Sequence, residues 1–187
     1  KAPSDAWRKP AYPERPGFRH ELVSTLMMLE LVRRAAPEHA GLAWSYRELL
    51  EAAGTPVVLP AEEERVANGA GVEELTSLSA EALDLVLYLV CAHHGKVRTS
   101  WSTTPNDQEA GHGGIHGVCE RDEVGPLALA MRGEPGARFE VPSLELSLAA
   151  AAIGLNPRYG ASWGDRVTRL LDRYGPHGLA YLEAIFR

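Results

Sequence analysis

The segment from Ala80 to His94 constrains the fold of this 187-residue chain more than any other. Its middle, LDLVLYLV at 83–90, leaves hardly any polar face when it is drawn as a helix. A helix that is apolar all round is buried inside a domain rather than laid on its surface. Ser79 is a predicted N-cap and Gly95 a predicted stop. We therefore expect one buried helix over 80–94, with the rest of the chain packed around it.

Helical spacing of apolar residues recurs along most of the chain. The other helices that it predicts lie at 18–36, 45–54, 144–153, 162–174 and 176–187. Two of them begin with a capping-box pattern, Ser45 to Glu48 in one and Ser162 to Asp165 in the other. From about 96 to 142 the pattern dissolves into glycine, proline and charge. The prediction is a mainly α fold, a helical bundle with a long irregular insertion at about 96–142.

Composition narrows the class of protein. The hydrophobic fraction of 45% is enough for a real core, and no apolar run reaches the roughly 18 residues needed to cross a bilayer. The formal charge of −6 is opposite to the basic balance of a stand-alone nucleic-acid binder. Two cysteines make no disulfide framework, which favours a cytoplasmic setting. We expect one domain over 18–187, preceded by an extended lead-in at 1–17, as a fragment of a longer chain.

Three of the seven histidines stand at the ends of the two most hydrophobic segments. His20 lies in the first turn of the helix predicted at 18–36, and His93 and His94 end the buried helix. Neighbours on a helix point about 100° apart, so both can serve one site only where the helix ends and the pair splays. One interpretation is that they are ordinary core or surface residues. The other is an inward cluster that binds a metal ion or a phosphate.

Polar residues near these histidines also allow two interpretations each. Lys96 and Arg98 either contact phosphates or form a solvated turn. Ser24, one turn after His20, either orients that ring or a phosphate, or bonds the backbone of its own helix.

Four other residues carry expectations. Trp101 and Trp163 are expected to pack in the core, and a base stacked on Trp101 is the weaker alternative. Asp84 needs a cation or an N–H partner because its helix is buried, and we expect it to bond a helix end. His39 is expected at the surface.

The histidine motifs resemble a known family. RHELVS at 19–24 and AHHGKVR at 92–98 are similar to the HD-type nuclease domain of the CRISPR-associated helicase–nuclease of type I systems. The likeness is closest to the branch whose HD domain follows the helicase. Later segments agree, namely GVCERDEVG, LELSLAAAAIG and the stretch from Ser162 to Arg187. The resemblance covers the chain from Phe18 onward, and its motifs are specific together but weak singly.

The resemblance implies an HD-type helical domain that degrades single-stranded DNA in antiviral defence, as a metal-dependent phosphodiester hydrolase. His20, His93 and His94 would be the catalytic metal ligands, mainly for the second metal position. The ion would be a divalent transition metal (manganese, nickel, cobalt, iron or zinc) or magnesium. The implied partners are single-stranded DNA, a helicase domain of the same or a partner chain, and an RNA-guided surveillance complex, with no membrane.

Two departures from the family limit this prediction. The chain contains no His-Asp dipeptide, which the family places before a lysine upstream of the RHE stretch, and Lys1 could be that lysine. The family's aspartate beyond the YLEA helix is also absent. We expect weak or no nuclease activity from these 187 residues alone. Two alternatives remain: an HD phosphohydrolase acting on nucleotides, and a degenerate HD fold kept as a docking module. The natural reading frame on either side of these residues would test the docking-module alternative.

Overall fold

The computed structural model describes residues 18–67, 70–94, 99–103, 105, 107, 114–130, 136 and 138–186. Within this part of the chain the fold is mainly helical, with five α-helices and two small two-stranded sheets. The helical class predicted from the sequence is therefore confirmed. The lead-in expected at 1–17, and much of the insertion expected at 96–142, lie outside the described residues.

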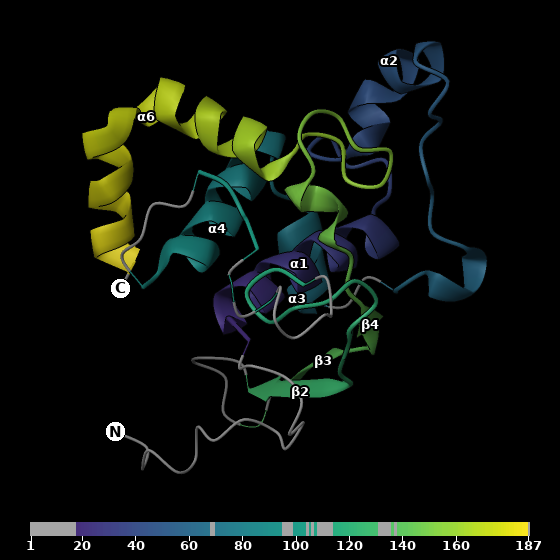
Figure 1. Ribbon diagram of the computed structural model, residues 1–187. Coiled ribbons are helices and arrows are strands. Elements are labelled where there is room, and N and C mark those ends of the chain that lie inside the picture. The colour runs from purple at the N-terminus through teal and green to yellow at the C-terminus, as the bar shows by residue number, and fades with distance from the viewer. Residues whose placement is uncertain are drawn as a thin grey trace.

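Two helices form the centre of the domain, α1 (His20–Ala35) and α4 (Ala80–Ala92), and they pack directly against each other (Figure 1). Their facing side chains are fully buried, among them Leu26, Leu29, Leu83 and Leu87. The central position of α4 confirms the prediction, and Ser79 caps it by accepting a bond from the backbone of Ala82.

The expectation that α4 is buried all round was wrong. Only one face is fully covered, and four apolar residues on the other side are partly exposed: Leu85, Val86, Leu89 and Val90. Leu85 and Leu89 still pack against the edge of the core. In this small domain, a helix with an almost wholly apolar sequence is stable with only one face fully buried.

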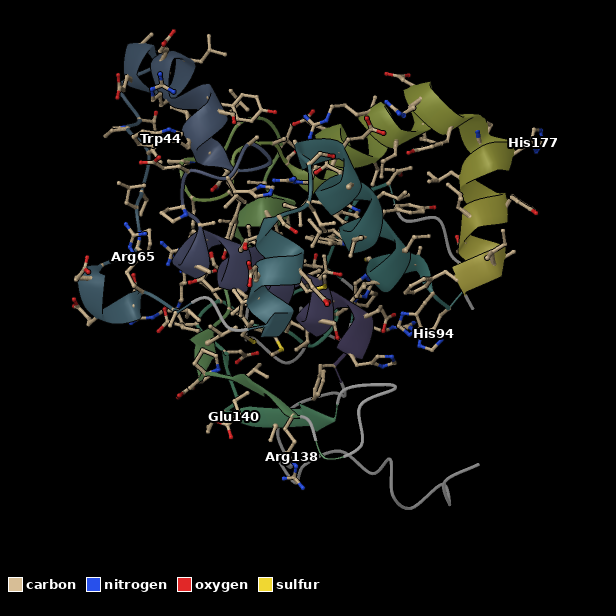
Figure 2. The ribbon with its side chains drawn as sticks, turned by 180° about the vertical axis from the view of Figure 1, so that it is seen from behind. Trp44, Arg65, His94, Arg138, Glu140 and His177 are labelled. Carbon is tan, nitrogen blue, oxygen red and sulfur yellow. The ribbon has the colours of Figure 1, made fainter. Side chains whose placement is uncertain are left out.

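Helix α6 (Trp163–Phe186) starts with the predicted capping box. The hydroxyl of Ser162 accepts a bond from the Asp165 backbone at 3.2 Å, and the Asp165 carboxylate accepts from the Ser162 backbone N–H at 3.3 Å. Gly175, at φ 67° and ψ 166°, breaks the helix just before Pro176. This is the boundary expected between two helices. Beyond it, the second half turns toward the C-terminal end of α4 in both views (Figures 1 and 2).

The region between α1 and α4 holds more structure than the sequence predicted. A 3-10 turn (Ala43–Tyr46) leads into α2 (Arg47–Ala52), and a second one (Glu62–Glu64) precedes α3 (Ala70–Thr76). The capping box expected at Ser45 does not form, because its hydroxyl donates to the Ala40 carbonyl instead. Residues 55–72, where apolar spacing predicts no helix, contain the second 3-10 turn and the start of α3, which packs on α1.

Short antiparallel strands follow the histidine pair in the sequence. Strand β1 (Glu123–Val124) pairs with β4 (Leu144–Glu145), and β2 (Leu127–Ala130) pairs with β3 (Arg138–Val141). The helix expected at 144–153 was wrong. Leu144 pairs with Val124, and only a 3-10 turn (Leu148–Ala151) follows. Pairing with a distant strand outweighs the local helical spacing.

A buried ion pair joins α4 to α6. Asp84, 4% exposed, pairs with Arg166, and its second oxygen accepts from Arg169 at 2.6 Å. The same Arg166 also donates to the carbonyls of Gly41 and Tyr159. The bond to a helix end that we expected for Asp84 was wrong, because two guanidinium groups satisfy this carboxylate.

Candidate metal centre

Three imidazoles from distant parts of the chain meet at one point. His20 is the first residue of α1, His93 is the C-cap of α4, and His94 follows it. The Nε2 atom of His20 lies 3.2 Å from Nε2 of His93 and 3.1 Å from Nε2 of His94. One nitrogen from each ring lies within 4.8 Å of the others. The predicted convergence is confirmed.

The cluster lies at the surface rather than facing inward as expected. Figure 2 shows His94 at the lower end of α4, beside the start of α1. Among the described residues, His20 and His94 are exposed and His93 is half-buried.

The start of α1 is held by a turn from the region predicted as irregular. The backbone N–H of Arg19 donates to the His116 carbonyl at 3.0 Å. The buried carboxylate of Asp107 accepts from the backbone N–H groups of His116 and Gly117 at 2.9 and 2.6 Å. Asp107 thereby fixes the turn that fixes the helix start carrying His20. Nothing in the sequence around Asp107 indicated this role, because its partners lie nine and ten residues further along the chain.

A backbone contact sets the tautomer of His93. Its Nδ1 atom lies 2.6 Å from the carbonyl oxygen of Val90. A carbonyl only accepts, so Nδ1 carries the proton and the Nε2 lone pair is left facing the other rings. A metal-binding histidine is commonly oriented in this way through its second nitrogen.

Desolvation by neighbouring groups and the adjacent charge of His93 lower the pKa of His94, and Glu21 partly opposes them. A lowered pKa favours the neutral imidazole, which is the form that binds a metal ion.

Trp101 anchors the chain beyond the histidine pair. It is 6% exposed and stacks on Trp163 with ring centroids 4.3 Å apart and planes 15° apart. Its indole N–H also points to Cys91 Sγ at 3.4 Å. The packing expected for both tryptophans is confirmed. The burial of Trp101 does not favour the alternative that it stacks a base, because Trp163 covers one face of its ring.

The structure describes only some of the other residues for which the sequence predicted a contact or a position. Lys96 and Arg98 lie outside the described residues, so their contact with phosphate stays a prediction. Ser24 is half-buried on α1, and within the described chain its hydroxyl makes no hydrogen bond to His20. His39 was wrongly expected at the surface. It is 9% exposed, and it donates to the Leu78 carbonyl while accepting from the Gly41 N–H.

The donor set fits one transition-metal ion. Bonds of about 2.1 Å place neighbouring ligand atoms about 3.0–3.4 Å apart, depending on the coordination geometry. The two short nitrogen separations, 3.1 and 3.2 Å, fall in this range. Imidazole suits manganese, iron, cobalt, nickel or zinc, whereas magnesium prefers oxygen ligands. Within the described residues no carboxylate joins the group.

Comparison of the chain with family models, curated proteins and solved structures found no match.

No helix among the described residues has both the length and the apolar character required to cross a bilayer.

Proposed function

We propose that this chain is a metal-dependent nuclease module of the HD type, acting on single-stranded DNA. The observation that supports it best is the approach of two Nε2 atoms, those of His93 and His94, to within 3.2 and 3.1 Å of Nε2 of His20, from positions 73 and 74 residues away in the sequence. The motifs that carry the family resemblance are the same segments that meet in space. His20, His93 and His94 would hold a divalent transition metal.

Each part of the site has a role in this proposal. When bound, the ion would supply a polarised water and would neutralise charge on the phosphodiester. The fixed tautomer of His93 keeps its lone pair ready, so little reorganisation is needed for capture. The exposure of His20 and His94 leaves room for a DNA backbone. Lys96 and Arg98 would contact its phosphates.

The site as described is incomplete for two-ion hydrolysis. That chemistry uses a carboxylate to hold two ions about 3.5–4 Å apart. The sequence has no His-Asp dipeptide, and the described residues bring no carboxylate into the cluster. We therefore propose that the 187 residues bind one ion and cleave DNA weakly or not at all.

The partners follow from the same proposal. An acidic chain with a formal charge of −6 captures DNA poorly by itself. A helicase domain, of the same or another chain, would deliver single-stranded DNA, under the direction of an RNA-guided surveillance complex.

The test combines metal binding with substrate choice. Cobalt(II) is titrated into the metal-free chain and into His93→Ala, with His177→Ala as the matched control. His177 is exposed and points away from the body of the domain (Figure 2). We expect one ion to bind to the native chain and to the control, and none to His93→Ala. Failure of the native chain to bind cobalt, nickel, manganese or zinc contradicts the proposal.

Substrate choice separates the nuclease from its alternatives. The protein tested also carries the His-Asp pair and the final aspartate of the family pattern. It is loaded with metal and incubated with a single-stranded oligonucleotide and with free nucleotides. Cleavage of the oligonucleotide supports the nuclease. Turnover of nucleotides alone favours a phosphohydrolase, and turnover of neither favours a docking module.

A further inference from the structure

We propose that Glu21 is a positioning residue, which orients the His20 imidazole so that its Nε2 lone pair faces His93 and His94. This inference rests on the proposed metal site and adds a residue to it. Its basis is the position of a buried carboxylate directly behind an exposed ring.

Glu21 is an acid where an apolar residue would be expected. It is 2% exposed and lies one turn before Thr25 and two before Leu29, on the face of α1 that is buried in the core. Its backbone is fixed, because the Thr25 hydroxyl donates to the Glu21 carbonyl at 2.8 Å. A buried carboxylate is unfavourable unless charged or N–H groups surround it. Charged or N–H groups are therefore expected around the Glu21 carboxylate.

The two carboxylate oxygens face different side chains. Oε1 lies 3.5 Å from Nη1 of Arg19, and Oε2 lies 3.7 Å from Nδ1 of His20. The second distance exceeds a hydrogen bond. The His20 side chain is 52% exposed, so a small rotation of the ring can close the gap. The Nδ1–H group then donates a hydrogen bond to the carboxylate, which leaves the Nε2 lone pair free to bind a metal ion.

His93 provides the comparison. Its Nδ1 donates to a backbone carbonyl at 2.6 Å, which selects the same tautomer. A backbone carbonyl thus lies at hydrogen-bond distance from Nδ1 of His93, and the Glu21 carboxylate lies 3.7 Å from Nδ1 of His20. Carboxylate support raises the basicity of a histidine ligand and fixes its orientation.

The experiment reads the His20 tautomer directly. Nitrogen-15 spectra of the metal-free chain are compared for the native protein, Glu21→Gln and Glu21→Met, at one fixed pH. Glu38→Gln, an exposed acid just after α1, controls for the lost charge. We expect a protonated Nδ1 on His20 in the native chain and the control, a mixed tautomer in Glu21→Gln, and loss of the preference in Glu21→Met. If Glu21→Met does not fold, Glu21→Gln decides.

Nickel(II) affinity by calorimetry gives the second readout. Loss of a supporting carboxylate weakens metal binding by about 10- to 100-fold, and Glu38→Gln should bind as the native chain does. An unchanged His20 tautomer, or an unchanged affinity in both Glu21 variants, overturns the inference while leaving the proposed function intact. Failure of the native chain to bind metal overturns the proposed function instead, and the spectra of the metal-free chain still decide on Glu21.

Discussion

The Nδ1 atom of His93 lies 2.6 Å from the carbonyl oxygen of Val90, one turn earlier on α4. The last carbonyls of a helix have no partner within the helix, so they are free to accept from a side chain. The end of α4 thus orients a candidate ligand without any further residue. For His20, at the start of α1, the group near Nδ1 is the Glu21 carboxylate, 3.7 Å away.

Metal binding should raise the stability of the domain. An ion that binds the folded state alone stabilises it by about 2.7 kcal/mol when its free concentration is about 100 times Kd. We expect nickel(II) to raise the melting temperature of the native chain, and EDTA to reverse the change. The measurement is a thermal melt followed by circular dichroism. His94→Ala should lose the response and His177→Ala should keep it; an equal response in both would place the ion elsewhere.

Acid should destabilise the domain through Glu30. Burial alone would raise the pKa of this carboxyl, but hydrogen bonds from Arg33 and Arg34 outweigh it and lower the pKa from 4.5 to about 2. Because the folded pKa is the lower one, the stabilisation is fully present above pH 4.5 and is lost as the pH falls toward 2.

The measurement is denaturant unfolding of the native chain and of Glu30→Gln between pH 7 and pH 3. We expect the variant to be less stable at neutral pH, and the gap between the two proteins to shrink in acid. A gap that stays constant across this range would contradict the assigned role of Glu30.

Removing Asp84 should be far more harmful than removing an exposed acid. Breaking a buried ion pair leaves an uncompensated charge and costs roughly 3–5 kcal/mol. Here the Arg166 side chain is 1% exposed, so Asp84→Ala leaves a buried guanidinium without its carboxylate partner. The matched control is Glu48→Ala, whose pair with Arg47 is largely exposed. An exposed pair contributes about 1 kcal/mol or less. Urea unfolding of both variants checks the difference, and similar losses would contradict the prediction.

Local spacing predicted the parts of the fold that depend on it. The apolar stripe through Leu22, Leu26 and Leu29 and the run at 83–90 gave the two central helices, because both signals repeat within a few residues. The segment at 144–153 failed for the opposite reason. Its helical spacing is real, but the pairing of Leu144 with Val124 is a contact that no local window contains.

The residues of the candidate site also fall into those that the sequence indicated and those that it did not. His20, His93 and His94 could be named because they interrupt apolar segments and match a motif. Glu21 and Asp107 could not, because only the fold shows that both carboxylates are buried. Glu21 stands beside His20 in the RHELVS motif, but nothing in the sequence shows that it is buried. Asp107 lies nine residues before His116, and the backbone that joins its turn to Arg19 has no sequence signature. Buried acids beside a candidate histidine are the signal to look for.

Trp101 should matter for stability and not for DNA. Truncating a buried tryptophan costs about 3–5 kcal/mol, and Trp101→Ala also removes the stack on Trp163. Trp44→Ala is the control, because Trp44 is half-buried and has the Arg47 guanidinium over its ring, 5.3 Å from the centroid. Urea unfolding should show a much larger loss for Trp101→Ala. For DNA, Trp101→Phe keeps the core filled, and its affinity for a single-stranded oligonucleotide should match that of the native chain. A marked loss of affinity in folded Trp101→Phe would mean that a base reaches this ring after all.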